Sequence, residues 1–197
     1  RQNIGSEAFT EETVQKPCAP YAVAKLACEK YLDYMRYAYS FPSTVLRQTN
    51  SYGRTNTDFF VMERIITQML NGSIVKLGDP SPFRNFLFID DLVTLYETLL
   101  LNDAAIDQIF VTGPDNALSI RALAATCADV LNWKGEIVWR TIPDRPGEVY
   151  YLNSNPSKAK DLLGWEPKID LRAGIALTAD RIRYSKNAEL LEAGSYG

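Results

Sequence analysis

The stretch Pro20-Tyr-Ala-Val-Ala-Lys-Leu-Ala-Cys-Glu-Lys-Tyr31 decides how the rest of the sequence is interpreted. It predicts a helix from about Tyr21 to Tyr39, which Phe41-Pro42 ends. Residues four apart share a helix face, so the Lys25 ammonium is expected near the Tyr21 hydroxyl. A phenol is ordinarily too weak an acid to serve as a base at neutral pH, and a neighbouring cation stabilises its ionised form. The spacing therefore predicts a catalytic tyrosine, with a chance pair on a surface helix as the alternative.

Composition excludes several classes of function. The chain has 197 residues and a net charge of −3, so it has no basic footprint for a nucleic acid. No apolar run has the length of a membrane span, and no charged-then-apolar leader is present. Hydrophobic residues make up 46% and charged residues 23%, as in ordinary soluble globular proteins. We therefore expect no nucleic-acid or membrane partner.

The chain contains no histidine, which restricts its chemistry. Serine–histidine triads, cysteine–histidine pairs and nearly all zinc sites are excluded, and no metal is expected. Cys18, Cys28 and Cys127 are odd in number and lack Cys-x-x-Cys spacing. They indicate free thiols in a reducing compartment, so a cytoplasmic location is expected. Acid–base chemistry is left to Tyr, Lys, Asp or Glu.

Helices and short strands alternate along the sequence, which predicts an α/β fold with a mainly parallel sheet. Helices are expected at about 21–39, 58–70, 90–101 (capped by Asp90), 119–133, 155–164 and 171–183. Strands are expected at 43–49, 74–77, 85–89, 108–113 and 136–140, with a loop at 50–54 and a frayed tail beyond 186. In the first helix, Ala27, Tyr31, Tyr34 and Ala38 form a stripe that predicts packing against the core or a second subunit.

Four further clusters follow the tyrosine–lysine pair in a fixed order. They are Arg47-Gln-Thr-Asn50-Ser-Tyr-Gly53, Arg84-Asn-Phe-Leu-Phe-Ile-Asp90-Asp91, Arg145-Pro-Gly-Glu148 and Leu162-Leu-Gly-Trp-Glu-Pro167. Each also has an ordinary structural interpretation. Arg84 could pair with Asp90 or Asp91, Arg145-Pro-Gly could be a plain turn, and Gly164-Trp165 could end a helix.

The order YxxxK, RxxNxYG, RNFxFIDD, RPGE, LGWxP resembles the NAD-dependent epimerase/dehydratase family, extended short-chain dehydrogenases that act on nucleotide sugars. The resemblance covers about Thr10 to Arg183. The family's glycine-rich phosphate loop, ribose-binding acid and catalytic Ser or Thr are missing, and Asn85 stands where aspartate is usual. The resemblance thus implies the C-terminal portion of a Rossmann-like parallel sheet plus a small α/β substrate-binding domain. Residues 1–50 would be a remnant of the dinucleotide-binding domain, 51–185 mainly substrate-binding, and 186–197 a flexible tail.

The resemblance also implies roles for residues near the cofactor. Tyr21 would be the catalytic base, and Lys25 its electrostatic partner, also bonded to the nicotinamide ribose. Asn50 and Tyr52 would lie beside the cofactor, with Tyr52-Gly53 shaping the loop near the nicotinamide. The implied cofactor is NAD, with NADP left open.

The substrate-binding residues follow from the same resemblance. Asn50, Arg84 and Arg145 would hold the diphosphate of a nucleotide-diphosphate sugar, for which guanidinium groups are well suited, and Glu148 the nucleotide ribose. Asp90 and Asp91 would be structural acids, as helix cap and first-turn residues.

The implied reaction oxidises the sugar at carbon 4 to a 4-keto intermediate, with Tyr21 as the base. We expect a 4-epimerase ahead of a 4,6-dehydratase, acting as a homodimer through the helix that begins at Tyr21. The chain alone is expected to be inactive. The alternative is a truncated, non-catalytic module that binds nucleotide sugars.

Overall fold

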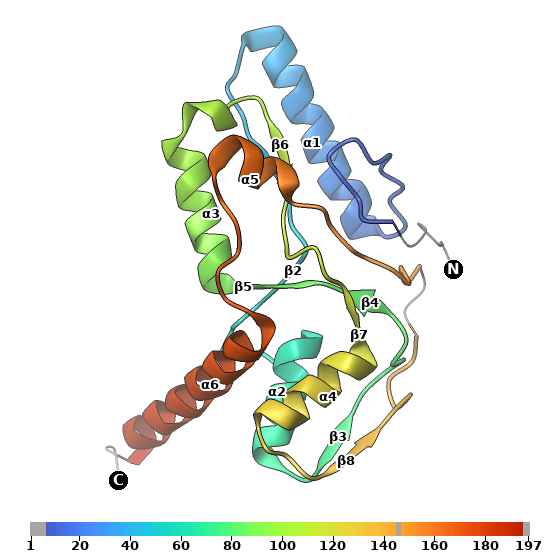
Figure 1. The fold of residues 1–197 in the computed structure, drawn as a ribbon, viewed down its shortest axis with the longest axis vertical. Coiled ribbons are helices and arrows are strands. Elements are labelled where there is room, and N and C mark those ends of the chain that lie inside the picture. Colours follow the sequence, from blue (N-terminus) through green and yellow to red (C-terminus); the bar gives the residue numbers. More distant parts are fainter. Residues whose placement is uncertain (1–6, 145–146, 195–197) are drawn as a thin grey trace.

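The structure is a computed structural model that describes residues 7–144 and 147–194 (Figure 1). Helices alternate with short strands, which confirms the predicted α/β class. The helices are α1 (Pro20–Tyr39), α2 (Val61–Asn71), α3 (Ile89–Leu101), the short η1 (Asp103–Ala105), α4 (Ile120–Val130), α5 (Ser157–Leu163) and α6 (Leu171–Gly194). The strands are β1 (Val45–Arg47), β2 (Asn50–Tyr52), β3 (Ile74–Lys76), β4 (Phe83–Arg84), β5 (Phe86–Phe88), β6 (Ile109–Val111), β7 (Leu118–Ser119) and β8 (Glu136–Val138).

The strands pair mostly in parallel, as predicted. β1 pairs with β6, β2 with β5 and β3 with β8 in parallel register, whereas β4 and β7 are antiparallel. Parallel pairing requires long crossovers, and the chain supplies them: 45–47 meets 109–111, and 50–52 meets 86–88. In Figure 1, α1 lies on one side of β6, and α3 and α5 lie on the other.

Two hydrophobic clusters form the core. The larger joins α2, α4 and α6 to β2 and β5, with Ile65, Ile66, Leu123 and Ile175 fully buried. The smaller packs α3 and α5 on β6 around Phe110. Both clusters are assembled from segments far apart in the sequence, so the formation of each depends on the strand crossovers.

Several predicted element boundaries are wrong, among them the three that follow. Residues 50–52 form strand β2 and not a loop, because parallel pairing with β5 stabilises an extended backbone there. Asp90 is not a helix cap, since α3 begins one residue earlier, with Phe88 at its N-cap. The last helix continues to Gly194, well beyond the predicted end near Arg183. No described helix is both long enough and apolar enough to cross a membrane.

Helix α1 presents most of its surface to solvent. Glu29 is its buried residue, whereas Tyr31, Tyr34 and Tyr37 are exposed. The predicted tyrosine stripe therefore does not pack against the core formed by the described residues. Its alternative role, contact with a second subunit, stays a prediction.

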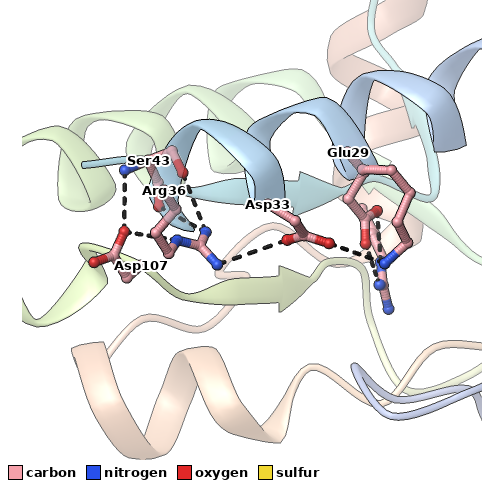
Figure 2. Close-up of polar contacts among 7 residues, drawn as sticks. Glu29, Asp33, Arg36, Ser43 and Asp107 are labelled. Atoms are coloured by element: carbon pink, nitrogen blue, oxygen red, sulfur yellow. Dashed lines mark hydrogen bonds and ion pairs between the residues drawn. The ribbon is translucent and has the colours of Figure 1, made fainter. Parts of the chain in front are cut away.

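Two polar clusters hold α1 on the β1–β6 pair. Near its middle, the Glu29 carboxylate accepts hydrogen bonds from Arg47 of β1, at 2.5 and 3.2 Å. Near its end, Arg36 Nε donates to Asp107 Oδ1 at 2.8 Å and Arg36 Nη2 donates to Ser43 Oγ at 3.1 Å (Figure 2). These contacts fix the helix that carries Tyr21 and Lys25 relative to the sheet.

Candidate functional site

Tyr21 and Lys25 lie in the first turns of α1, where Pro20 occupies the start of the helix. The Tyr21 side chain is 73% exposed, and Lys25 is also exposed. The Lys25 Nζ lies 5.6 Å from the centre of the Tyr21 ring. The two side chains therefore share one helix face, as the spacing predicts, and remain open to a ligand.

The turn that carries Glu148 packs against the segment leading into α1. Cys18 Sγ donates to the Gly147 carbonyl at 3.2 Å. Gly147 has a φ of +75°, and a Cβ at this position would lie 2.7 Å from the Cys18 carbonyl oxygen. Only glycine fits so closely in this backbone conformation, which brings residues 147 and 148 beside the start of the Tyr21 helix. Arg145 lies outside the described residues.

Arg84 and Glu148, both predicted to bind substrate, form an ion pair across the site. Arg84 Nη2 donates to Glu148 Oε1, and Arg84 Nη1 donates to the Phe83 carbonyl at 2.7 Å. Arg84 is 9% exposed, and burial lowers its pKa while the Glu148 carboxylate partly offsets that effect. An arginine this buried is costly to leave without a partner, so Arg84 needs an anion or another acceptor beside it.

Asp90 and Asp91 serve other contacts, so the suggestion that either pairs with Arg84 is wrong. Asp90 Oδ2 accepts from Arg181 Nη2 at 2.7 Å. Asp91 accepts from the backbone amides of Lys168 and Ile169, at 3.1 and 3.0 Å. These two acids attach α3 to α6 and to the loop before it, which agrees with a structural role.

Asn50 lies at the start of β2 with its side chain exposed. Its Nδ2 donates to the Asn85 carbonyl at 3.3 Å, directly next to Arg84. A continuous path of contacts therefore runs from the segment before Tyr21, through Glu148 and Arg84, to Asn50. The structure thus brings together segments that are far apart in the sequence, since the Cys18 and Gly147 contact joins residues 129 positions apart.

Tyr52 is buried in the larger core cluster, at 1% exposure, and makes edge contacts with the rings of Phe86 and Phe88. Burial, followed by nearby acidic groups and Cys127, raises its pKa above the usual range of a phenol. The Tyr52 hydroxyl has no hydrogen-bond partner among the described residues. Tyr52 is therefore enclosed by the described residues, and its predicted place beside the cofactor stays a prediction.

Asn85, which replaces the family's usual aspartate, is fully buried. Its Nδ2 donates to the Pro114 carbonyl at 2.7 Å and to Ser154 Oγ at 2.5 Å. A carboxylate could not donate to Pro114. The NH2 group of the amide is therefore satisfied and connects the strand carrying Arg84 to residues 114 and 154, whereas the buried Oδ1 has no hydrogen-bond partner among the described residues.

Glu63 is a residue that the sequence did not single out. It is fully buried in α2, and its Oε1 accepts from the backbone amides of Gly53 and Arg54, at 3.1 and 3.3 Å. Arg54 Nη1 also donates to it at 3.2 Å. Glu63 thus fixes the loop after β2. A glutamate in an amphipathic helix gives no sequence signal for such a contact.

A cavity of about 560 Å³ lies between loops 114–118 and 165–171. Trp165 and Lys160 line it, and none of the predicted site residues does. Among the described residues, no group of acidic or cysteine side chains could hold a metal ion.

Parallel strand pairs, crossover helices and a tyrosine–lysine helix define a Rossmann-like α/β protein. The protein-family model described as GDP-mannose 4,6 dehydratase matches residues 3–178. The chain belongs to the NAD-dependent epimerase/dehydratase family.

Two curated relatives illustrate the range of the family. The dTDP-glucose 4,6-dehydratase of Xanthomonas campestris pv. campestris is 29% identical over 182 residues, which cover 87% of this chain and 51% of that protein. The UDP-glucose 4-epimerase of Mycolicibacterium smegmatis is 28% identical over 178 residues, covering 88% and 56%. The chain thus spans about half the length of the curated relatives it matches.

Solved structures agree with this assignment. The UDP-glucose 4-epimerase of Thermotoga maritima with UDP-glucose superposes with a TM-score of 0.83 at 27% identity, covering 92% of this chain and 60% of that one. The UDP-glucuronic acid 4-epimerase of Bacillus cereus, in complex with UDP-glucuronic acid and NAD, superposes with a TM-score of 0.83 at 25% identity. The match covers 91% of this chain and 57% of that one.

Proposed function

We propose that the protein carrying this chain is a nucleotide-sugar epimerase/dehydratase that oxidises its substrate at carbon 4. Of the two activities, we favour 4-epimerisation over 4,6-dehydration. The observation that carries the proposal is the path of contacts linking the Tyr21 helix, the Arg84–Glu148 pair and Asn50. A base and an anion-binding group converge there from distant parts of the sequence.

The chain's polar side chains fit a nucleotide-diphosphate sugar. The planar guanidinium of Arg84 can donate to phosphate oxygens, and we assign the same role to Arg145. The exposed amide of Asn50 can donate to the same diphosphate. The Glu148 carboxylate, with its side chain 38% exposed, can accept hydrogen bonds from ribose hydroxyls.

Tyr21 and Lys25 supply the chemistry of this chain. In the proposed reaction, Tyr21 takes the proton from the hydroxyl at carbon 4 of the sugar, and the Lys25 ammonium stabilises the phenolate. Lys25 can also donate to the hydroxyls of a cofactor ribose, because it is exposed on the same face as Tyr21. The nicotinamide cofactor, NAD with NADP left open, supplies the hydride acceptor when bound.

The test is Tyr21→Phe in the protein that carries this chain, with UDP-glucose and dTDP-glucose as substrates and products identified by NMR. Loss of a general base lowers rates by about 10²–10⁴-fold, so we expect kcat to fall in this range while nucleotide affinity changes little. Tyr31→Phe is the matched control, because Tyr31 is exposed on the same helix. Near-normal activity of Tyr21→Phe would overturn the assignment.

A second candidate function is a non-catalytic module that binds nucleotide sugars. It is favoured by the diphosphate-binding candidates Asn50 and Arg84, which can bind a nucleotide sugar without a redox cofactor. Calorimetric titration with UDP-glucose and NAD separates the two. Binding of the sugar nucleotide without NAD binding or turnover would favour the module.

A further inference from the structure

The anion-binding group of the proposed site already holds an anion. Arg84 Nη2 is paired with the Glu148 carboxylate, and its Nη1 is bonded to the Phe83 carbonyl at 2.7 Å. The Arg84 side chain is 11% exposed, so few water molecules can replace a lost partner. A diphosphate that binds Arg84 through Nη2, from the side where Glu148 lies, must therefore take the place of that carboxylate.

Glu148 is the partner that can move. Arg84 belongs to strand β4, which pairs with β7, and its head group is fixed by Phe83 of the same strand. Glu148 lies after the Gly147 turn, which the Cys18 thiol holds through a sulfur hydrogen bond, and its side chain is 38% exposed. The carboxylate can rotate toward solvent without disturbing either hydrophobic cluster.

We propose that Glu148 is a specificity-determining residue that competes with the ligand's diphosphate for Arg84. A free inorganic anion must displace the carboxylate from Arg84 and offers no hydroxyl group that could donate a hydrogen bond to it. A nucleoside diphosphate displaces it at Arg84 and then offers it ribose hydroxyls as hydrogen-bond donors. The pair would thus select nucleotides against inorganic pyrophosphate, by unfavourable interaction with the wrong ligand as well as attraction for the right one. This inference rests on the proposed function.

The experiment measures calorimetric affinities at fixed ionic strength for inorganic pyrophosphate, a nucleoside diphosphate and its 2′,3′-dideoxy analogue. The nucleotide is UDP or GDP, whichever the unmodified protein binds more tightly. Glu148→Gln is compared with Glu166→Gln, which removes the same charge from an exposed pair with Lys160. Glu148→Ala is a second variant, and circular dichroism confirms that each variant folds.

We expect Glu148→Gln to bind pyrophosphate about tenfold more tightly, the scale of losing one competing charged partner. Its preference for the nucleotide over the dideoxy analogue should fall about tenfold, because the hydroxyls lose their charged acceptor. Unchanged pyrophosphate affinity, an unchanged preference, or an equal effect of Glu166→Gln would each overturn the inference. In that case the unmodified protein still binds the nucleotide, whereas failure of the unmodified protein to bind any nucleotide would overturn the proposed function as well.

Discussion

The buried ion pair between Glu29 and Arg47 attaches α1, the helix with the proposed base, to strand β1. The Glu29 side chain is 7% exposed and Arg47 is 19% exposed. Glu29 Oε1 accepts from Arg47 Nη2 at 2.5 Å, and Oε2 accepts from Arg47 Nε at 3.2 Å and Gln15 Nε2 at 3.0 Å. Arg47 Nη1 also donates to the Glu11 carbonyl at 2.6 Å, so the pair is well satisfied.

Removal of one partner should destabilise the protein strongly. Arg47→Met leaves the Glu29 carboxylate buried without its main donor, and such losses cost about 3–5 kcal/mol when burial is complete. Because Arg47 is 19% exposed, water reaches the site, and we expect about 2–4 kcal/mol. The double variant Glu29→Leu with Arg47→Met should lose clearly less than the sum of the two single variants, since it leaves no charge unpaired. Lys30→Gln, which breaks an exposed pair with Asp33 on the same helix, should cost less than about 1 kcal/mol.

The assay is urea unfolding followed by circular dichroism, with free energies compared at a common m-value. Burial opposes ionisation of Glu29, but hydrogen bonds from Arg47 and Gln15 outweigh it, so the pKa of Glu29 is lowered. Its contribution to stability is therefore complete above the pKa of an unfolded glutamate, near 4.3, and is lost as the pH falls through the folded value. The coupling between the two residues should shrink accordingly in acid. Additive single variants at pH 7, or a coupling independent of pH, would refute this reasoning.

Three further predictions concern buried residues. Gly174→Ala would place a Cβ 2.0 Å from the Tyr52 hydroxyl, so it should lower the free energy of unfolding by about 1–3 kcal/mol. Adding Tyr52→Phe should restore part of the loss. Unchanged stability of Gly174→Ala would contradict this packing. Asn85→Asp would turn a carboxylate toward the Pro114 carbonyl, which would raise the pKa of the new carboxyl in the folded state. Stability should therefore fall as the pH rises above about 4. A loss of stability that does not vary with pH would argue against this contact. Burial raises the pKa of Cys127 to about 12, so its thiol should resist iodoacetamide at pH 8, as mass spectrometry would show, while the exposed cysteine of α1 reacts.

Helix and strand positions could be predicted well where the pattern is local. The α1 prediction from 21 to 39 lies within a residue of Pro20–Tyr39, because its proline start and aromatic-proline end are encoded in adjacent residues. Strand β2 was missed because its extended conformation depends on β5, more than thirty positions away, from 50 to 86. The end of the last helix was misplaced for a different reason: the polar run Ser185-Lys-Asn187 was taken as the end of the helix, although Ala188, Leu190 and Leu191 follow it.

In the candidate site too, features set by neighbouring residues could be predicted, whereas contacts between distant segments could not. The side-by-side position of Tyr21 and Lys25 follows from helix geometry alone. The partner of Arg84 could not be predicted, since local acids at positions 90 and 91 were nearer in sequence than Glu148, which lies 64 residues away. Tyr52 shows the opposite difficulty: a motif placed it beside a ligand-binding loop, but the structure places it in β2, and only the packing of α6 at Gly174 reveals that its hydroxyl is enclosed.

The proposed base and the proposed anion-binding group are coupled through polar contacts rather than a shared hydrophobic core. Helix α1 contributes no residue to either buried cluster and is held by Glu29 and Arg36. Among the described residues, Arg84 is connected to the segment before α1 through Glu148 and the contact of Gly147 with Cys18. Because hydrogen bonds and ion pairs are directional, such connections set the position of Tyr21 without adding much to overall stability. Substitutions at the exposed members of this path should therefore change catalysis and ligand affinity more than they change the unfolding midpoint. Loss of a partner from buried Glu29 or buried Arg84 should also lower stability.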